Sequence, residues 1–116
     1  MDKMIKISNI TKMAMSEQDG KNLRTEMQQY LDNGDDVILD FSNISLFATP
    51  FFNASIGFFV LRLSPDTLQS KVKLINLSEL GEETYKHSLD NATEYFINHV
   101  DTEQIGIITK NTIENN

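Results

Sequence analysis

The pair Thr49-Pro50 combines a hydroxyl side chain with a residue that favours the start of a helix. Proline lacks a backbone N–H and its fixed φ suits the first turn of a helix, while the residue before it is pushed toward extended geometry. We therefore predict that a helix starts here, with Thr49 as its N-cap. The Thr49 hydroxyl then acts either as a cap alone or also as a regulated site, and the local pattern allows both.

Three further polar side chains precede this helix start: Asp40, Ser42 and Ser45. Asp40 closes an apolar run, and an aspartate at a strand end often accepts hydrogen bonds from loop amides. We expect Asp40 to stabilise the loop, although a functional carboxylate at this position is the alternative. Ser42 and Ser45 are interpreted as turn residues in preference to phosphoacceptors.

Metal binding and catalysis have little support in the residue spacing. His87 and His99 have no third ligand at metal spacing, and the chain has no cysteine. The pairs Glu82-Glu83 and Asp35-Asp36 read as helix-start and turn charges, because a catalytic pair needs an enclosed pocket and shifted pKa values. No glycine-rich phosphate loop is present. We predict no metal, no cofactor and no enzymatic activity.

Length and composition predict one globular domain over residues 1–116, with 110–116 as a flexible tail. The chain is 40% hydrophobic and 23% charged, close to the average for folded domains. No apolar run approaches the length of a membrane helix, and the first residues lack the features of a signal peptide. We therefore expect a cytoplasmic protein that does not bind membranes.

The formal net charge is −7, and the ten lysines and arginines are scattered along the chain. An acidic protein without a basic patch is repelled by the phosphate backbone of nucleic acids. We predict that nucleic acid is not a partner.

Apolar periodicity and turn residues predict elements that alternate along the chain. The predicted strands cover residues 3–10, 37–41, 71–77 and 105–108, and the predicted helices cover residues 16–33, 49–63 and 78–96. This β-α-β-α-β-α-β order predicts a small α/β fold with a single mainly parallel or mixed sheet and packed helices. The near-continuous apolar run from Val37 to Phe41 predicts a strand that is covered on both faces.

The helix predicted over residues 49–63 carries two apolar stripes, and one stripe can face the sheet. The second stripe includes Phe51 and Phe58, which are either additional core or an exposed binding face. Gly57 removes a side chain from the middle of this helix and would allow a close approach to another element. In parallel sheets the functional surface lies where strand ends meet helix starts, which places the loop 42–50 there.

Residues 40–57 resemble a signature of the STAS-like family, which includes anti-sigma-factor antagonists and domains of sulphate transporters. In that family a strand ends in Asp-Phe-Ser-Gly-Val, and Thr-Ser-Ser-Phe then opens a helix that continues with Ala-Asp-Glu and a Gly. Here Asp40-Phe41-Ser42 match directly, followed by Asn43 and Ile44 in place of Gly and Val. Residues 48–51 occupy the helix start, 52–54 the next three positions, and Gly57 falls at the Gly. The resemblance extends by pattern over residues 16–97 and implies a STAS-like fold.

The resemblance also implies a non-enzymatic regulatory domain in a partner-switching circuit. Its partner would be a histidine-kinase-like ATPase that acts as a serine/threonine kinase. Thr49 falls on the position that is phosphorylated in the antagonists, although Ala48 replaces the usual Asp and Pro50 replaces a small residue. The residues expected to bind the partner are Ser42, Asn43, Ser45, Ala48, Thr49, Pro50, Phe51, Asn53, Ala54 and Phe58.

Two alternatives come from other functional classes. One is a constitutive scaffold or self-association module, in which Thr49 is never modified and the strand near Ile105 pairs with another chain. The other is a small enzyme or nucleotide-binding protein that uses a pocket at the strand ends.

Overall fold

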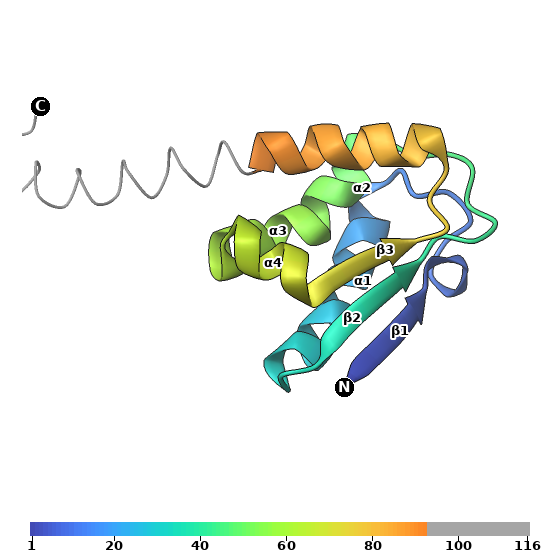
Figure 1. The fold of residues 1–116 in the computed structure, drawn as a ribbon. Helices are drawn as coiled ribbons and strands as arrows, with labels where there is room; N and C mark the ends of the chain where they lie inside the picture. The colour runs from blue at the N-terminus through green and yellow to red at the C-terminus, as the bar shows by residue number, and fades with distance from the viewer. Residues whose placement is uncertain (93–116) are drawn as a thin grey trace, which may run out of the picture.

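A computed structural model of the chain describes residues 1–92, which form a small α/β fold (Figure 1). The sequence prediction of a parallel sheet with packed helices is confirmed. In chain order the elements are β1 Asp2–Lys6, the 3-10 helix η1 Ile7–Asn9, α1 Glu17–Asp32, β2 Asp36–Asp40, α2 Thr49–Ala54, α3 Ile56–Leu63, α4 Pro65–Lys71, β3 Val72–Ile75 and a helix over residues 79–92. The strand predicted at 105–108 and the tail 110–116 lie outside the described residues.

The sheet of the described part has three parallel strands in the order β1-β2-β3. Ile5 pairs with Leu39, which in turn pairs with Leu74. Each crossover moves the chain by one strand in the same direction, and α1 lies behind the sheet in Figure 1. Parallel neighbours need such helical crossovers, which bring the carboxyl ends of all three strands to one edge of the sheet.

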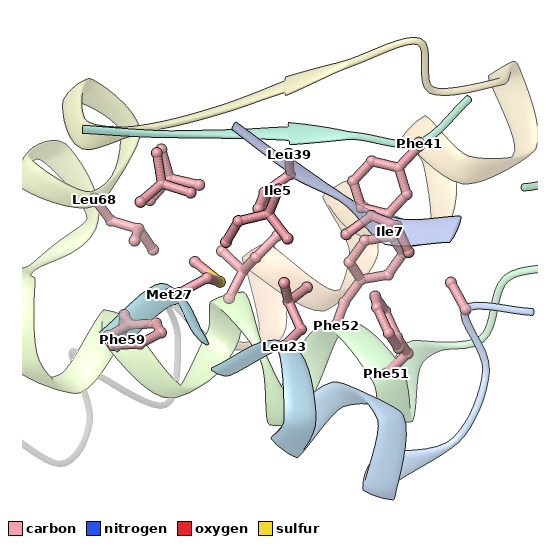
Figure 2. Close-up of a cluster of buried hydrophobic side chains, with 14 of the residues drawn as sticks. Ile5, Ile7, Leu23, Met27, Leu39, Phe41, Phe51, Phe52, Phe59 and Leu68 are labelled. Carbon is pink, nitrogen blue, oxygen red and sulfur yellow. The ribbon is translucent and has the colours of Figure 1, made fainter. Parts of the chain in front are cut away.

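The central strand β2 is covered on one face within the described residues, so the prediction of two covered faces is wrong there. Val37 and Leu39 are fully buried, whereas Ile38 between them is half-buried. Its neighbour in the register, Met4, is 52% exposed. Figure 2 shows the apolar side chains filling the space between the sheet and the helices on that one side. An apolar run therefore does not reveal whether both faces of a strand are covered.

The first strand is shorter than the predicted 3–10, because it ends at Lys6. Lys6 pairs with Asp40, the last residue of β2, so the residues after it have no strand to pair with. The chain instead turns into η1, where the N–H groups of Ile10 and Thr11 both donate to the carbonyl oxygen of Ile7. The side chain of Ile7 is still fully buried, which explains the apolar pattern.

Two predicted helix starts are confirmed. The Ser16 hydroxyl accepts a hydrogen bond of 3.0 Å from the Asp19 N–H and caps α1. The Ser78 hydroxyl accepts one of 3.1 Å from the Gly81 N–H at the start of the helix over residues 79–92. Both serines stand directly before an amphipathic stretch, which is why the sequence identifies them.

The single helix predicted over residues 49–63 is in fact two helices that meet at Ser55. The Ser55 hydroxyl donates a hydrogen bond of 2.7 Å to the carbonyl oxygen of Phe51. A serine that bonds back to the preceding turn competes with the helical ladder and bends the helix. The backbone of Ser55 accordingly departs from helical geometry, with φ −98° and ψ −88°.

The short helix α4 is absent from the sequence prediction, which has no element between the helix over residues 49–63 and the strand over residues 71–77. Ser64 does end α3, but its backbone takes a positive φ of 69° and its hydroxyl accepts a hydrogen bond from the Thr67 N–H. Leu68 is the buried anchor of α4. One apolar residue in seven gives no helical periodicity, so the sequence pattern could not indicate this helix.

Candidate functional site at the start of α2

Asp40 anchors the loop that leads from β2 to α2. One of its carboxylate oxygens accepts hydrogen bonds from the side-chain amide of Asn76 at 2.9 Å, from the Ser42 N–H at 2.9 Å and from the Ser42 hydroxyl. The hydrogen bonds from Asn76 and Ser42 lower the pKa of Asp40 to about 2. The carboxylate is therefore ionised at neutral pH and fixes the loop to the ends of two neighbouring strands.

Asn76 is a site residue that the sequence analysis missed. It follows the last residue of β3 with a positive φ of 60°, and its amide also donates to the Ser42 hydroxyl at 3.0 Å. The ends of adjacent parallel strands share one edge, so a polar residue after β3 could have been paired with Asp40 once the strand order was known.

The loop then forms a short bridge with the segment that precedes α1. Ala14 and Phe47 pair in parallel: the Ala14 N–H donates to Leu46 and the Ala48 N–H donates to Ala14, both at 2.9 Å. Ala14 is fully buried and Phe47 packs against the core. Side chains alternate along an extended chain, so the neighbours of these two residues point outward.

Those outward neighbours form an exposed apolar surface, the methionine-leucine patch of Met13, Met15 and Leu46. Met13 is 51% exposed, Met15 40% and Leu46 47%. No pattern in the sequence indicates this patch, because segment 11–15 has no periodicity and its side chains are placed only by its pairing with the loop. Large exposed apolar side chains that gather at one place are typical of binding surfaces.

Thr49 is the first residue of α2, and its prediction as the N-cap is wrong. Ala48 occupies the N-cap with extended backbone, φ −147° and ψ 150°, and no side-chain cap hydrogen bond is made there. Pro50 lies in the first turn, as expected. The bridge with Ala14 holds Ala48 extended and shifts the helix start by one residue. Thr49 is partly exposed and its hydroxyl does not cap the helix.

The comparison with known families agrees with this arrangement of strand, loop and helix. A family model described as a STAS-like domain of unknown function (DUF4325) matches residues 19–82, more than half of the chain. The chain belongs to this STAS-like family. The resemblance drawn from residues 40–57 is thereby confirmed. No curated protein and no solved structure matches the chain.

In this STAS-like fold Phe51 belongs to the core, which is one of the two roles that the sequence left open for it, and its contact with a partner stays a prediction. Its side chain is fully buried beside Phe52, with the two ring centroids 5.5 Å apart (Figure 2). The bend at Ser55 turns the α2 segment so that both phenylalanines face inward. A partner could reach Phe51 only if α2 left the sheet.

Asn53 and Ala54 also hold α2 in place. The Asn53 side-chain oxygen accepts a hydrogen bond from the hydroxyl of Ser88, which is buried on the helix over residues 79–92. Ala54 lies against Gly20 of α1, where an added Cβ would come within 2.9 Å of the Ala54 Cβ. Both residues border solvent next to Pro50, in a shallow hollow that Glu17 also lines.

Phe58 lies beyond the bend, on α3, between two arginines. The guanidinium carbons of Arg24 and Arg62 lie 4.3 Å and 4.9 Å from the ring centroid, within cation–π range. The ring is half-buried and packs against the core. The structure thus places Phe58 on a different helix from the loop and the α2 start, where Ser42, Asn43, Ser45, Ala48, Thr49 and Pro50 lie together.

Within residues 1–92 no three histidine or acidic side chains come together as metal ligands. His87 is exposed, and His99 lies outside the described part of the chain. No described helix combines the length and the apolar character that crossing a bilayer requires.

Proposed function

We propose that this chain is a non-enzymatic regulatory domain that binds a protein partner through the α2-start surface, defined as the methionine-leucine patch with Thr49 and Pro50. The observation that carries the proposal is the exposure of Met13, Met15 and Leu46 beside the start of α2. Membership of the STAS-like family supports an interaction role in general terms.

The patch can supply binding free energy because its side chains are apolar and its backbone is already ordered. Full burial of one such side chain is worth roughly 1.5–3 kcal/mol. The hydrogen bonds of Asp40 and the Ala14–Phe47 bridge fix the loop before binding. Little conformational entropy is then lost on association.

Thr49 is the position at which binding would be switched. The partner of this chain would be a histidine-kinase-like ATPase. This ATPase would transfer the γ-phosphoryl group of ATP to the Thr49 hydroxyl oxygen and release ADP, while a base of the kinase takes up the hydroxyl proton. The phosphate adds about −1.5 to −2 charges next to the apolar patch. A partner would have to desolvate this charge, so phosphorylation should weaken the complex.

The binding claim is tested by titration calorimetry with a histidine-kinase-like ATPase from the same genome. Met13→Glu should weaken binding at least about tenfold, because it places a charge inside the apolar contact. Met4→Glu is the matched control, since Met4 is equally exposed but lies on the open face of the sheet. Equal loss in both variants, or no loss in Met13→Glu, would remove the α2-start surface as the binding site.

The switching claim is tested by intact mass after incubation of the same pair with ATP. One added phosphate is expected on the wild-type chain and on Ser45→Ala, and none on Thr49→Ala. Persistence of the added phosphate in Thr49→Ala would exclude Thr49 as the acceptor while leaving the binding claim intact.

A further inference from the structure

The two arginines of the chain lie over the same phenylalanine ring. Arg24 of α1 and Arg62 of α3 are the only arginines in the sequence. Their guanidinium carbons lie 4.3 Å and 4.9 Å from the centroid of the Phe58 ring. Phe58 and Arg24 are half-buried, and Arg62 is exposed. The fold thus brings two positive charges from distant parts of the sequence together, in what we call the arginine-phenylalanine cluster.

The position of this cluster follows from the packing of α1 against α2 and α3. Gly20 of α1 lies against Ala54 of α2. Arg24 stands one helical turn after Gly20, and Phe58 stands four residues after Ala54, beyond the bend at Ser55. The cluster is therefore built on helices that are already packed together, so little backbone entropy is lost when a ligand binds there.

Both guanidinium groups keep N–H donors for a ligand. Within residues 1–92 neither arginine lies in an ion pair, and Glu17 at the start of α1 is paired with Lys21 at 3.3 Å. A phenyl ring offers no oxygen acceptor, whereas a guanidinium presents a planar fork of donors that matches a carboxylate. The two positive charges also repel each other, and bound anionic groups would offset this repulsion. The cluster is thus suited to bind carboxylates.

We propose that the arginine-phenylalanine cluster binds an acidic segment of a protein partner, with a carboxylate on each guanidinium and an apolar side chain on the accessible part of Phe58. Charge complementarity favours this occupant, because a short segment with few carboxylates is neutralised by two arginines. The net charge of −7 repels longer polyanions such as nucleic acids. A free inorganic anion could not use the apolar ring. The cluster shares no residue with the α2-start surface, so this proposal is independent of the proposed function.

NMR of the full chain observes the cluster directly, because its two arginines give the only two arginine Nε–Hε signals. The probe is the peptide acetyl-Glu-Glu-Leu-Glu-Glu-amide, added at constant ionic strength. Both signals should shift together and saturate with one dissociation constant. The same peptide with glutamine in place of every glutamate, and inorganic phosphate, should each bind at least about tenfold more weakly. Shifts that never saturate, or an affinity for either control within about tenfold of the acidic peptide, would overturn the proposal.

Variants of single charges locate the contact. Arg24→Gln and Arg62→Gln should each weaken binding of the acidic peptide at least about fivefold, because one two-pronged ion pair is lost. Lys86→Gln is the matched control, since it removes the same charge from an exposed position on the helix over residues 79–92, and it should change the affinity less than about twofold.

Arg62→Lys separates a specific contact from general attraction between charges. It keeps the positive charge but lacks the planar fork, so it should still bind the peptide more weakly than the wild type. Arg62 is exposed, so its variants should stay folded by circular dichroism even if Arg24→Gln does not. Equal losses in Arg62→Gln and Lys86→Gln, or wild-type affinity in Arg62→Gln, would overturn the cluster as the binding site.

Discussion

Asp40 shows how one side chain sets the shape of the α2-start surface. Its carboxylate ties Ser42 to Asn76 and so joins the loop to two strand ends. The Ser42 and Asn76 groups all donate hydrogen bonds to the carboxylate and stabilise its ionised form. This stabilisation lowers the pKa of Asp40 to about 2. The role that the structure shows for this residue is to position the loop.

Asp40 should therefore make stability depend on pH in the acid range. Its folded pKa of about 2 lies below the ordinary value of 3.8, so the ionised carboxylate stabilises the fold fully above pH 3.8. This stabilisation is lost as the pH falls toward 2. Asp40→Asn should thus be destabilised in urea at pH 7, and its difference from the wild type should shrink below pH 3.8.

Carboxyl 13C titration by NMR measures the cause directly. Asn76→Ala removes the strongest contributor and should move the pKa of Asp40 back toward 3.8. A wild-type Asp40 that already titrates near 3.8 would contradict the hydrogen-bonded arrangement.

Phe51 and Phe58 should respond differently to the same truncation. Phe51→Ala leaves a cavity in the core where the ring is fully buried, and it should lower the free energy of unfolding by about 3–5 kcal/mol. Phe58→Ala removes a half-buried ring and its contacts with Arg24 and Arg62, and should cost about half as much. Urea unfolding monitored by circular dichroism compares the two, and equal losses would be inconsistent with the burial described.

Among the elements, the crossing of α1 and α2 depends most on a single small residue. An added Cβ at Gly20 would overlap the carbonyl oxygen of Phe51 and approach Ala54 within 2.9 Å. The sequence pattern assigned a close approach to Gly57 and gave none to Gly20. Close approach is a property of two elements together, and the spacing of residues within one element cannot reveal it.

Gly20→Ala should consequently destabilise the protein despite the higher helix propensity of alanine. Propensity alone favours alanine by about 1 kcal/mol, whereas overpacking costs about 1–3 kcal/mol or more. We expect a net loss of stability in thermal and urea unfolding. Asn22→Ala, at an exposed position of α1, is the control and should change stability by less than about 0.5 kcal/mol. A Gly20→Ala protein as stable as the wild type would disprove the tight crossing.

For the molecule as a whole, the sequence predicted the fold class, the first helix and the helix starts near residues 16 and 78, because these depend on local patterns. It placed the candidate site at the loop between β2 and α2, since strand ends and helix starts meet there in any parallel sheet. It could not predict the bend at Ser55, the bridge between Ala14 and Phe47, or the exposure of Met13. Each of these follows from contacts between segments distant in sequence.

The open face of the sheet is the main rival to the α2-start surface at this scale. It carries Met4 and Ile38, which no described helix covers. A partner that bound there would leave the methionine-leucine patch in solvent. The two faces contain different residues, so one mapping experiment distinguishes them.

NMR cross-saturation from the unlabelled kinase-like ATPase to the labelled STAS-like chain tests the central claim most directly. Saturation should reach the amides of residues 13–15 and 45–49, because these surround the methionine-leucine patch. Residues 4 and 38 should remain unaffected. Saturation centred on residues 4 and 38, with none at 13–15 or 45–49, would contradict binding through the α2-start surface.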